Sequence, residues 1–344
     1  MSINKKTFTY AIIITVCIIL AGIYVDKTTK INLGIISQPQ KNIVQQIGNT
    51  LGDYGQAPDF KKGDNWLNTQ PLTMANLQGK VVLVDFWTYS CINCIRTLPY
   101  VTRWYNTYKD NGLVVVGVHT PEFTFEHDTN NVKNAIAQFG INYPVVQDND
   151  YAIWNSYGNE YWPAEYLINQ KGEIVEENFG EGEYDVTENN IRQLLGLAPI
   201  NIKINSDNLS KISSPEMYFG TSRLANLTPE QSYSLTPKNY VLSKNLASNS
   251  FSLGGTWQFS DANAQLTSDA GEVNLKFHAG KVFIVASSPI TAHLTITVDG
   301  KKQSDVVVGQ SKLYTLFDSD NYSDHSIDVK ISQKGFEAFT FTFG

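Results

Sequence analysis

The sequence contains few cysteines and histidines and has no excess of positive charge. Its 344 residues include three cysteines and five histidines, and the net charge is −7. A structural zinc site needs about four Cys or His ligands, and neither a second CxxC nor an HxxxH is present, so zinc is a weak alternative and we expect no metal. The negative balance argues against a general nucleic-acid or anionic-membrane binder.

The N-terminus contains one long uncharged run. Lys5 and Lys6 precede the 19 uncharged residues from Thr7 to Val25, and Asp26 ends the run. This length is close to the ~20 residues of a membrane-spanning helix, and the lysines would stay on the cytoplasmic side. A cleaved signal peptide has a similar layout, but no A-x-A site is present. We expect an uncleaved anchor that leaves the rest of the chain outside the cytoplasm, in the periplasm, with secretion after cleavage as the alternative.

The chain beyond this run divides by composition into a tether and two domains. An α/β domain is predicted because the apolar runs VVLVDFW and GLVVVGVHT alternate with helical stretches and precede the predicted hairpin AEYLINQKGEIVEENFG. After a polar linker, strands of period two predict an all-β sandwich or jelly roll, with Leu294, Ile296 and Val298 facing inward. The expected boundaries are 1–6 cytoplasmic tip, 7–25 anchor, 26–54 linker, 55–198 α/β domain, 199–214 linker and 215–344 β-domain.

Cys91 and Cys94 form a CxxC at the junction of the strand VVLVDFW and a predicted helix. A sulfur at the start of a helix receives the helix dipole and unpaired N–H groups, which favour the reactive thiolate. Cys94 lies one helical turn further on and can reach the same sulfur. We therefore expect Cys91 to attack disulfides and Cys94 to resolve the mixed disulfide. A static bridge is the alternative, but so small a loop constrains the unfolded chain little.

The segment VDFWTYSCINCIRTLP resembles the active-site segment of the thioredoxin family. The resemblance implies that Asp85 is the buried acid below the disulfide and that Pro99 interrupts the active-site helix. It also implies that Pro163, in YWPAEYLINQKGEIV, is the cis-proline opposite the cysteines. The dipeptide Ile92-Asn93 departs from the family's Gly-Pro, which leaves the reduction potential open.

Further residues around this motif have predicted roles. A buried acid has a raised pKa, so Asp85 could accept the proton of Cys94. Tyr89 and Trp162, with Pro163, are predicted to dock substrates, whereas Trp87 is expected in the core. His119 is interpreted as an ordinary residue at a strand end.

A longer stretch, QAPDFKKGDNWLNTQPLTMANLQGKVVLVDFWTYSCINC, resembles the TlpA/ResA-like branch and, with VVGVHTPEF, the DipZ family. PEMYFGTSR, LKFHAGKVFIV and EAFTFTFG resemble the DipZ C-terminal β-domain, which is carbohydrate-binding-like and implies a possible glycan ligand. Fused DipZ proteins carry a CcdA-like electron-transfer domain, so the resemblance implies a separate CcdA/DsbD-like membrane donor here. Trp257, Tyr314 and Tyr322 could stack on a sugar if they are exposed, but most aromatics in strands belong to the core, so the sequence identifies no sugar site.

These patterns predict a membrane-anchored thiol–disulfide oxidoreductase that acts on protein disulfides, in the reducing direction, with no cofactor beyond its own cysteines. Two alternatives stay open. A thiol peroxidase would use Thr88 with Arg96 or Arg103 beside one cysteine. A glycan-binding module would make the redox site vestigial.

Overall fold

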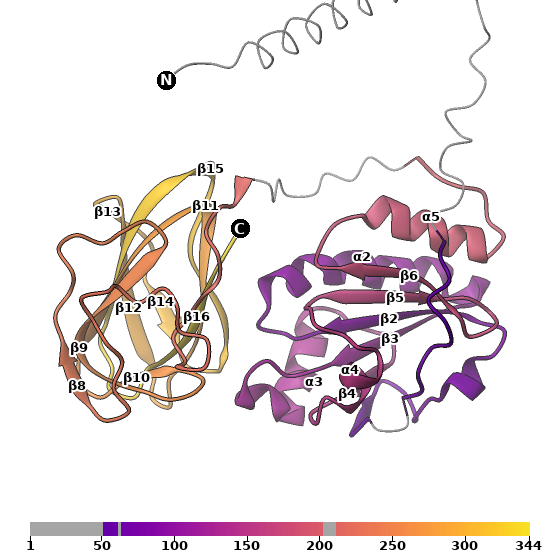
Figure 1. Ribbon diagram of the computed structural model, residues 1–344, viewed down its shortest axis with the longest axis horizontal. Coiled ribbons are helices and arrows are strands. Elements are labelled where there is room, and N and C mark those ends of the chain that lie inside the picture. The colour runs from indigo at the N-terminus through magenta and orange to yellow at the C-terminus, as the bar shows by residue number, and fades with distance from the viewer. Residues whose placement is uncertain (1–50, 61–62, 202–210) are drawn as a thin grey trace, which may run out of the picture. The chain divides into compact units, whose positions relative to one another are not determined.

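The computed structural model describes residues 51–60, 63–201 and 211–344. The predicted anchor, most of the tether and residues 202–210 of the polar linker lie outside these ranges. Within the described part of the chain, no helix is both long and apolar enough to span a membrane. The described residues form an α/β domain (51–201) and a β-domain (211–344), each shown in Figure 1.

The α/β domain is built on a six-stranded mixed sheet of order β1-β4-β3-β2-β5-β6. β2 pairs parallel with β3 and antiparallel with β5, so it lies in the middle of the sheet. Its seven residues are all buried, as expected for an apolar strand covered on both faces. The strands are β1 (Trp66–Leu67), β2 (Val81–Trp87), β3 (Leu113–His119), β4 (Val145–Gln147), β5 (Ala164–Ile168) and β6 (Ile174–Phe179).

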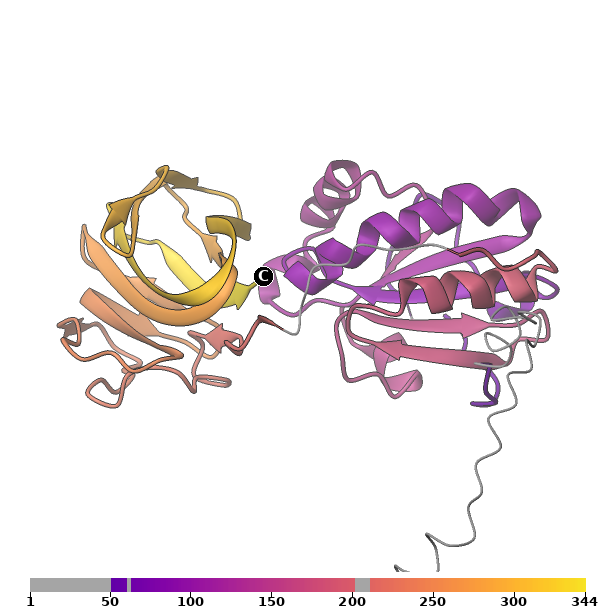
Figure 2. The same ribbon diagram turned by 90° about the horizontal axis from the view of Figure 1, so that it is seen from above.

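Helices cover both faces of this sheet. Side chains of α2, α3 and α5 share one apolar cluster with Val81, Leu83 and Trp87, whereas α4 packs with the residues of opposite parity, Val82 and Phe86. Figure 2 shows α2 and α5 along the sheet. The α-helices are α2 (Ile92–Tyr108), α3 (Thr129–Gln138), α4 (Ala152–Ser156) and α5 (Tyr184–Leu194), and the 3₁₀ turns are η2 (Met74–Leu77), η3 (Lys109–Asn111) and η4 (Thr124–His127). The α/β prediction is confirmed.

The start of α5 is not marked by a capping residue type. The helix begins at Tyr184 with Glu183 as its N-cap, and no described side chain caps it. Thr187 is buried inside the helix and donates its hydroxyl to Glu176 Oε1 at 2.6 Å. A tertiary hydrogen bond, which local pattern does not show, therefore uses this hydroxyl.

The β-domain is one continuous ten-stranded sheet that folds over a single core. Two long strands make this possible, since β11 pairs with β9 at its start and with β16 at its end while β15 follows it throughout. The all-β prediction is confirmed, although several predicted short strands are merged. The strands are β7 (Met217–Tyr218), β8 (Lys238–Tyr240), β9 (Ser250–Phe259), β10 (Ala264–Leu266), β11 (Gly271–Ser287), β12 (Ala292–Val298), β13 (Lys301–Lys302), β14 (Val306–Val308), β15 (Lys312–Ile331) and β16 (Glu337–Phe343).

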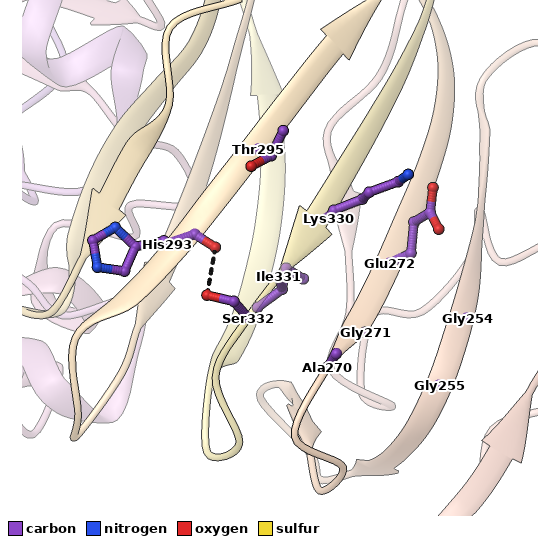
Figure 3. Close-up of a pocket in the computed structure, with 10 residues that line it drawn as sticks. All are labelled: Gly254, Gly255, Ala270, Gly271, Glu272, His293, Thr295, Lys330, Ile331 and Ser332. Carbon is purple, nitrogen blue, oxygen red and sulfur yellow. Dashed lines mark hydrogen bonds between the residues drawn. The ribbon is translucent and has the colours of Figure 1, made fainter. Parts of the chain in front are cut away.

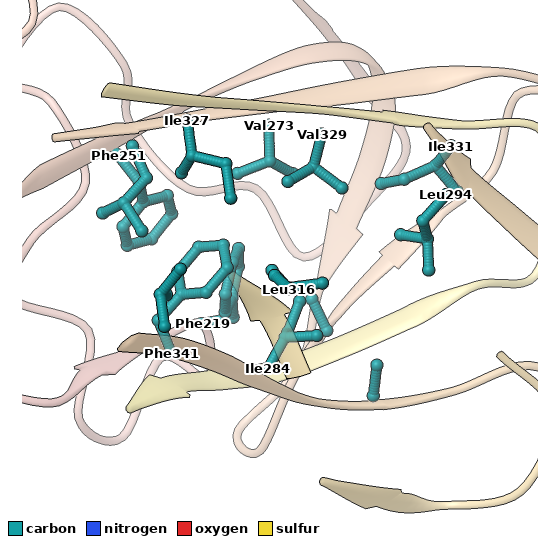
Figure 4. Close-up of a cluster of buried hydrophobic side chains, with 14 of the residues drawn as sticks. Phe219, Phe251, Val273, Ile284, Leu294, Leu316, Ile327, Val329, Ile331 and Phe341 are labelled. Carbon is teal, nitrogen blue, oxygen red and sulfur yellow. The ribbon is translucent and has the colours of Figure 1, made fainter. Parts of the chain in front are cut away.

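The core of the β-domain follows the period-two pattern. Leu294, Ile296 and Val298 are buried, as predicted, while the residues between them are more exposed. Figure 4 shows Leu294 with Ile331, Ile284 and Leu316 between strands on two sides. This core holds the domain together by apolar packing.

Candidate active site

Cys91 is the N-cap of α2. Its backbone is extended (φ −80°, ψ 115°), and its Sγ accepts a hydrogen bond from the backbone N–H of Cys94 at 3.3 Å. The sulfur therefore occupies the place of a capping oxygen, at the positive end of a 17-residue helix. This position favours a negatively charged sulfur.

The two cysteines are free thiols that differ in accessibility. Cys91 is 8% exposed and Cys94 is 1% exposed. Burial raises the pKa of the Cys94 thiol well above its usual value, and the neighbouring Cys91 raises it further. Cys91 is thus the sulfur that a substrate can reach, and Cys94 needs a base to become a nucleophile.

Asp85 lies on the central strand β2 and is 1% exposed. Burial raises the pKa of the Asp85 carboxyl from 3.8 to about 7, and its negative charge contributes to the raised pKa of Cys94. The prediction that Asp85 is buried is confirmed. A carboxyl with this pKa is partly ionised near neutral pH and is suited to accept a proton.

The Trp162–Pro163 peptide bond is cis, as the thioredoxin resemblance implies. The segment lies beside the cysteines, with Cys91 Sγ 4.0 Å from the Trp162 carbonyl oxygen. The Trp162 indole donates to the Thr120 carbonyl oxygen at 3.1 Å, which fixes the ring.

The predicted docking residues differ in the surface that they offer. Trp162 is partly exposed, whereas Pro163 is buried and Tyr89 is only 6% exposed. The Tyr89 ring stacks on His119 at 5.7 Å and its hydroxyl donates to the Phe125 carbonyl oxygen. Tyr89 therefore contributes packing below the site and has little ring surface for a substrate.

Polar contacts hold the residues on either side of the cysteines. Ser90 donates to Glu126 Oε1 at 2.6 Å, and this buried carboxylate also accepts from the backbone N–H of Phe123. Asn93 accepts from Arg96, which forms an ion pair with Glu181 at 2.6 Å. These contacts restrict the backbone around the CxxC.

The residues of the peroxidase alternative have other partners. Thr88 Oγ1 lies 3.5 Å from His119 Nε2, and Arg103 forms an ion pair with Glu188 on α5 at 2.5 Å. Burial lowers the pKa of His119 to about 3, so its ring is neutral. No specific contact in the described chain favours peroxide chemistry over disulfide exchange.

Sequence reasoning missed Glu165 and Tyr143. Glu165 lies on β5, is 2% exposed, and stands opposite Asp85 in the β2–β5 pairing. Tyr143 is fully buried, and the charges of Asp85 and Cys94 both raise its pKa further than burial alone. A glutamate inside the apolar strand AEYLI was the available signal.

The aromatics proposed to stack on a sugar are mainly core residues. Trp257 is fully buried and Tyr314 is 9% exposed, which corrects their interpretation as surface residues; Tyr322 is partly exposed. The β-domain instead has an open cavity of about 530 Å³ with both apolar and polar lining residues, shown in Figure 3. Glu272, Lys330 and Thr295 are successive partners on β11, β15 and β12 and line this cavity, and no aromatic side chain is among its described lining residues.

Over the described ranges, no group of three or more His, Cys, Asp or Glu side chains is arranged to hold a metal.

Comparison with known proteins gives two matched domains. The Redoxin family matches residues 51–195, and the family described as thioredoxin like C-terminal domain matches residues 214–344. Protein DipZ of Mycobacterium bovis is 38% identical over 92% of this chain and 47% of its own length. The chain therefore spans about half the length of the DipZ proteins that it matches.

Two further relatives match the α/β domain. The thiol-disulfide oxidoreductase ResA of Bacillus anthracis is 31% identical over 37% of this chain and 69% of its own length. The solved thioredoxin domain of a thiol-disulfide oxidoreductase from Bacteroides vulgatus is 26% identical over 42% of this chain and 99% of its own, with a TM-score of 0.36. By its identity to ResA and DipZ over these lengths, the chain belongs to the thioredoxin-like DipZ/ResA family of thiol-disulfide oxidoreductases.

Proposed function

We propose that this protein is a membrane-anchored, extracytoplasmic thiol–disulfide oxidoreductase that reduces disulfides in protein substrates. One observation carries the proposal: a sulfur that is 8% exposed caps a helix, a more deeply buried thiol lies one turn behind it, and a buried acid is near enough for its charge to raise the pKa of that thiol. The ResA and DipZ relatives support the same chemistry.

The reaction has two exchange steps. The Cys91 thiolate attacks one substrate sulfur, the substrate disulfide breaks, and the released thiolate takes a proton from solvent. Cys94 then gives its proton to the Asp85 carboxylate and attacks Cys91 Sγ, so the Cys91–Cys94 disulfide forms and the second substrate sulfur leaves as a thiolate. Two electrons have moved from the cysteine pair to the substrate.

The substrate has to approach Cys91 past the segment that contains the cis-proline. Trp162 is the partly exposed aromatic beside Cys91 and is our candidate for docking, with the Trp162–Pro163 backbone alongside the mixed disulfide. Tyr89 supports this surface from below through its stack with His119.

Single cysteine variants test the reaction. Cys91→Ser should abolish reduction of a protein disulfide such as insulin, because the attacking sulfur is lost. Cys94→Ser should accumulate mixed disulfides that denaturing gels without reductant reveal, and Cys17→Ser is the control. Substantial insulin reduction by Cys91→Ser would overturn the proposed function.

The reduction potential tests the direction of electron flow. The chain would be equilibrated in thiol buffers of graded potential, alkylated and weighed. A midpoint near thioredoxin's ~−270 mV supports a reductase, whereas a midpoint near the ~−120 mV of a strong oxidant would make it a disulfide donor.

A reductase needs two electrons for each turnover, and we propose a CcdA/DsbD-like membrane protein as their source.

We also propose residues 7–25 as the anchor, supported by their length and by Lys5 and Lys6 before them. Membrane fractionation and the mass of the mature N-terminus test the anchor against a cleaved signal peptide.

For the β-domain we propose a glycan contact at the cavity of Figure 3. Its support is the row of hydrogen-bonding side chains Thr295, Lys330 and Glu272, with His293 at the rim. Binding to cell-wall glycans would weaken in Lys330→Ala; equal binding by both forms would place the contact elsewhere.

A further inference from the structure

The face of the central sheet below α2 contains a row of residues that is unusual for a core. Asp85 on β2 pairs with Gly117 on β3 and with Glu165 on β5, and Glu165 pairs with Asn178 on β6. Paired residues on adjacent strands point to the same face, with Cβ atoms about 4.5–5.5 Å apart. Two carboxyl side chains are therefore direct neighbours inside the domain.

Neither carboxyl forms a regular hydrogen bond with a described residue, although the Asn178 side chain on the next strand lies near Glu165 and lowers its pKa. Asp85 and Glu165 are 1% and 2% exposed, and all four of their carboxyl oxygens are without a hydrogen-bond partner among the described residues. The Tyr143 hydroxyl and the Trp87 indole N–H are unpartnered in the same sense. An unpaired buried charge is costly, so at least one of the two acids has to hold a proton.

Gly117 provides the space for this cluster. A Cβ atom at this position would lie 3.0 Å from Trp87 Nε1 and 3.0 Å from the Tyr143 ring. Even an alanine at this position would require these two rings to shift by a few tenths of an ångström. The absence of a side chain at Gly117 on β3 therefore leaves room for the polar residues beside it.

The groups around Glu165 decide which acid keeps the proton. Burial raises the pKa of Glu165 well above its usual value, and the charges of Asp85 and of Glu176 on β6 raise it further, while Asn178 lowers it. A negative charge on Glu165 also raises the pKa of Tyr184 on α5 and of Tyr143, so both hydroxyls are near this carboxyl. The charge of Glu176 acts on Glu165, whereas burial alone raises the pKa of Asp85, so we infer that Glu165 is the acid of the pair that holds the proton.

We propose that Glu165 is a positioning acid for Asp85: its protonated carboxyl donates a hydrogen bond to the Asp85 carboxylate and sets the pH range in which Asp85 accepts the proton of Cys94. The Glu side chain is long enough to bridge the separation of paired strands. A hydrogen bond to the charged form favours ionisation, so this donor keeps Asp85 available as a base. The inference rests on the proposed function, because it concerns the second exchange step.

The test uses 5,5′-dithiobis(2-nitrobenzoate) on the full chain. Attack by Cys91 releases one coloured thiolate, and attack by Cys94 on the resulting mixed disulfide releases the second, so the second phase reports the deprotonation of Cys94. Glu165→Leu removes the donor and should move the midpoint of the second-phase rate upward by about one pH unit, so that the second phase is about fivefold slower at pH 7. Glu165→Gln keeps an N–H donor and should stay near the parent.

Glu177→Gln is the matched control, because Glu177 pairs with Tyr166 and so belongs to the opposite face. A Glu165→Leu profile that coincides with the parent would overturn the inference. Failure of the parent chain itself to release the second thiolate would instead overturn the proposed function, so the two failures are distinguishable.

A second measurement needs no activity and covers the case in which Glu165→Leu does not fold. In ¹³C NMR of labelled carboxyls, Glu165 should stay protonated at pH 7, and Asp85→Asn should lower its midpoint by about one pH unit or more because a neighbouring charge is removed. An unchanged Glu165 midpoint in Asp85→Asn would show that the two acids are independent and would overturn the inference.

Discussion

The α/β domain and the β-domain both bury a large sheet, but they differ in what the sheet buries. Of the twelve buried side-chain polar atoms without a hydrogen-bond partner in the described chain, one belongs to the β-domain, Asn274 Oδ1. The others belong to the α/β domain and include both carboxyls of the Asp85–Glu165 pair.

The core of the β-domain serves to stabilise the fold, whereas the core of the α/β domain also contains groups that take part in the reaction. A core of Val, Leu, Ile and Phe gains free energy from every buried side chain, as in the β-domain. Buried acids without partners cost free energy, and such groups are concentrated at functional sites. The cost in the α/β domain lies below Cys91 and Cys94, where a proton has to move.

The largest expected loss of stability is in the apolar core of the β-domain. Trp257 is fully buried in the β-domain core, so Trp257→Ala should destabilise that domain by about 3–5 kcal/mol. Hydrogen exchange measured domain by domain should show faster exchange in residues 215–344 and an unchanged α/β domain. Equal loss of protection in both domains would mean that their stabilities are not separate.

Replacing Asp85 should change the folding stability in the opposite direction, so that the variant is more stable than the parent. Its folded pKa of about 7 lies above its usual 3.8, so the folded state loses stability as pH rises from about 4 to 7 and has no such penalty below pH 3.8. Asp85→Asn should flatten this slope and be more stable than the parent at pH 8, by up to about 4 kcal/mol. Urea unfolding at pH 5 and pH 8 checks the sign.

Asp85→Asn should also slow release of the mixed disulfide near pH 7, since the proton acceptor of Cys94 is lost. A variant that is less stable at pH 8 than the parent, or equally fast in release, would contradict the assignment of Asp85 as a buried base.

An ion pair in the α/β domain gives a smaller effect. The Glu188 side chain is 1% exposed and is held by Arg103, which is 42% exposed, and by the Tyr108 hydroxyl at 2.8 Å. Arg103→Ala leaves a buried carboxylate with one donor and should cost about 2 kcal/mol. Arg103→Lys is the control, and the pH profile of disulfide exchange should not move in either variant.

The smallest effect is expected on the surface of the β-domain. Lys330 is exposed on the outer face of β15, so Lys330→Ala should change the free energy of unfolding by less than about 0.5 kcal/mol. Any weakening of glycan binding in this variant then reports the cavity and not the fold. A large loss of stability would show that the row of Glu272 and Lys330 is structural.

Much of the molecule was predictable because it depends on local pattern. The CxxC lies at a strand–helix junction in the sequence and in the structure, and the period-two residues of β12 face the core. The cis bond before Pro163 and the burial of Asp85 followed from family resemblance. Predictions of surface exposure were weaker, since Tyr89, Trp257 and Tyr314 are buried by residues distant in the sequence.

The sequence by itself determined where the reactive sulfur is, because a helix N-cap is a local feature of strand, turn and helix signals. Only the tertiary structure decided what lies beneath it. Asp85 and Glu165 are 80 positions apart and become neighbours through the antiparallel pairing of β2 with β5. That register is fixed by packing of the whole sheet, and no segment of the chain contains it.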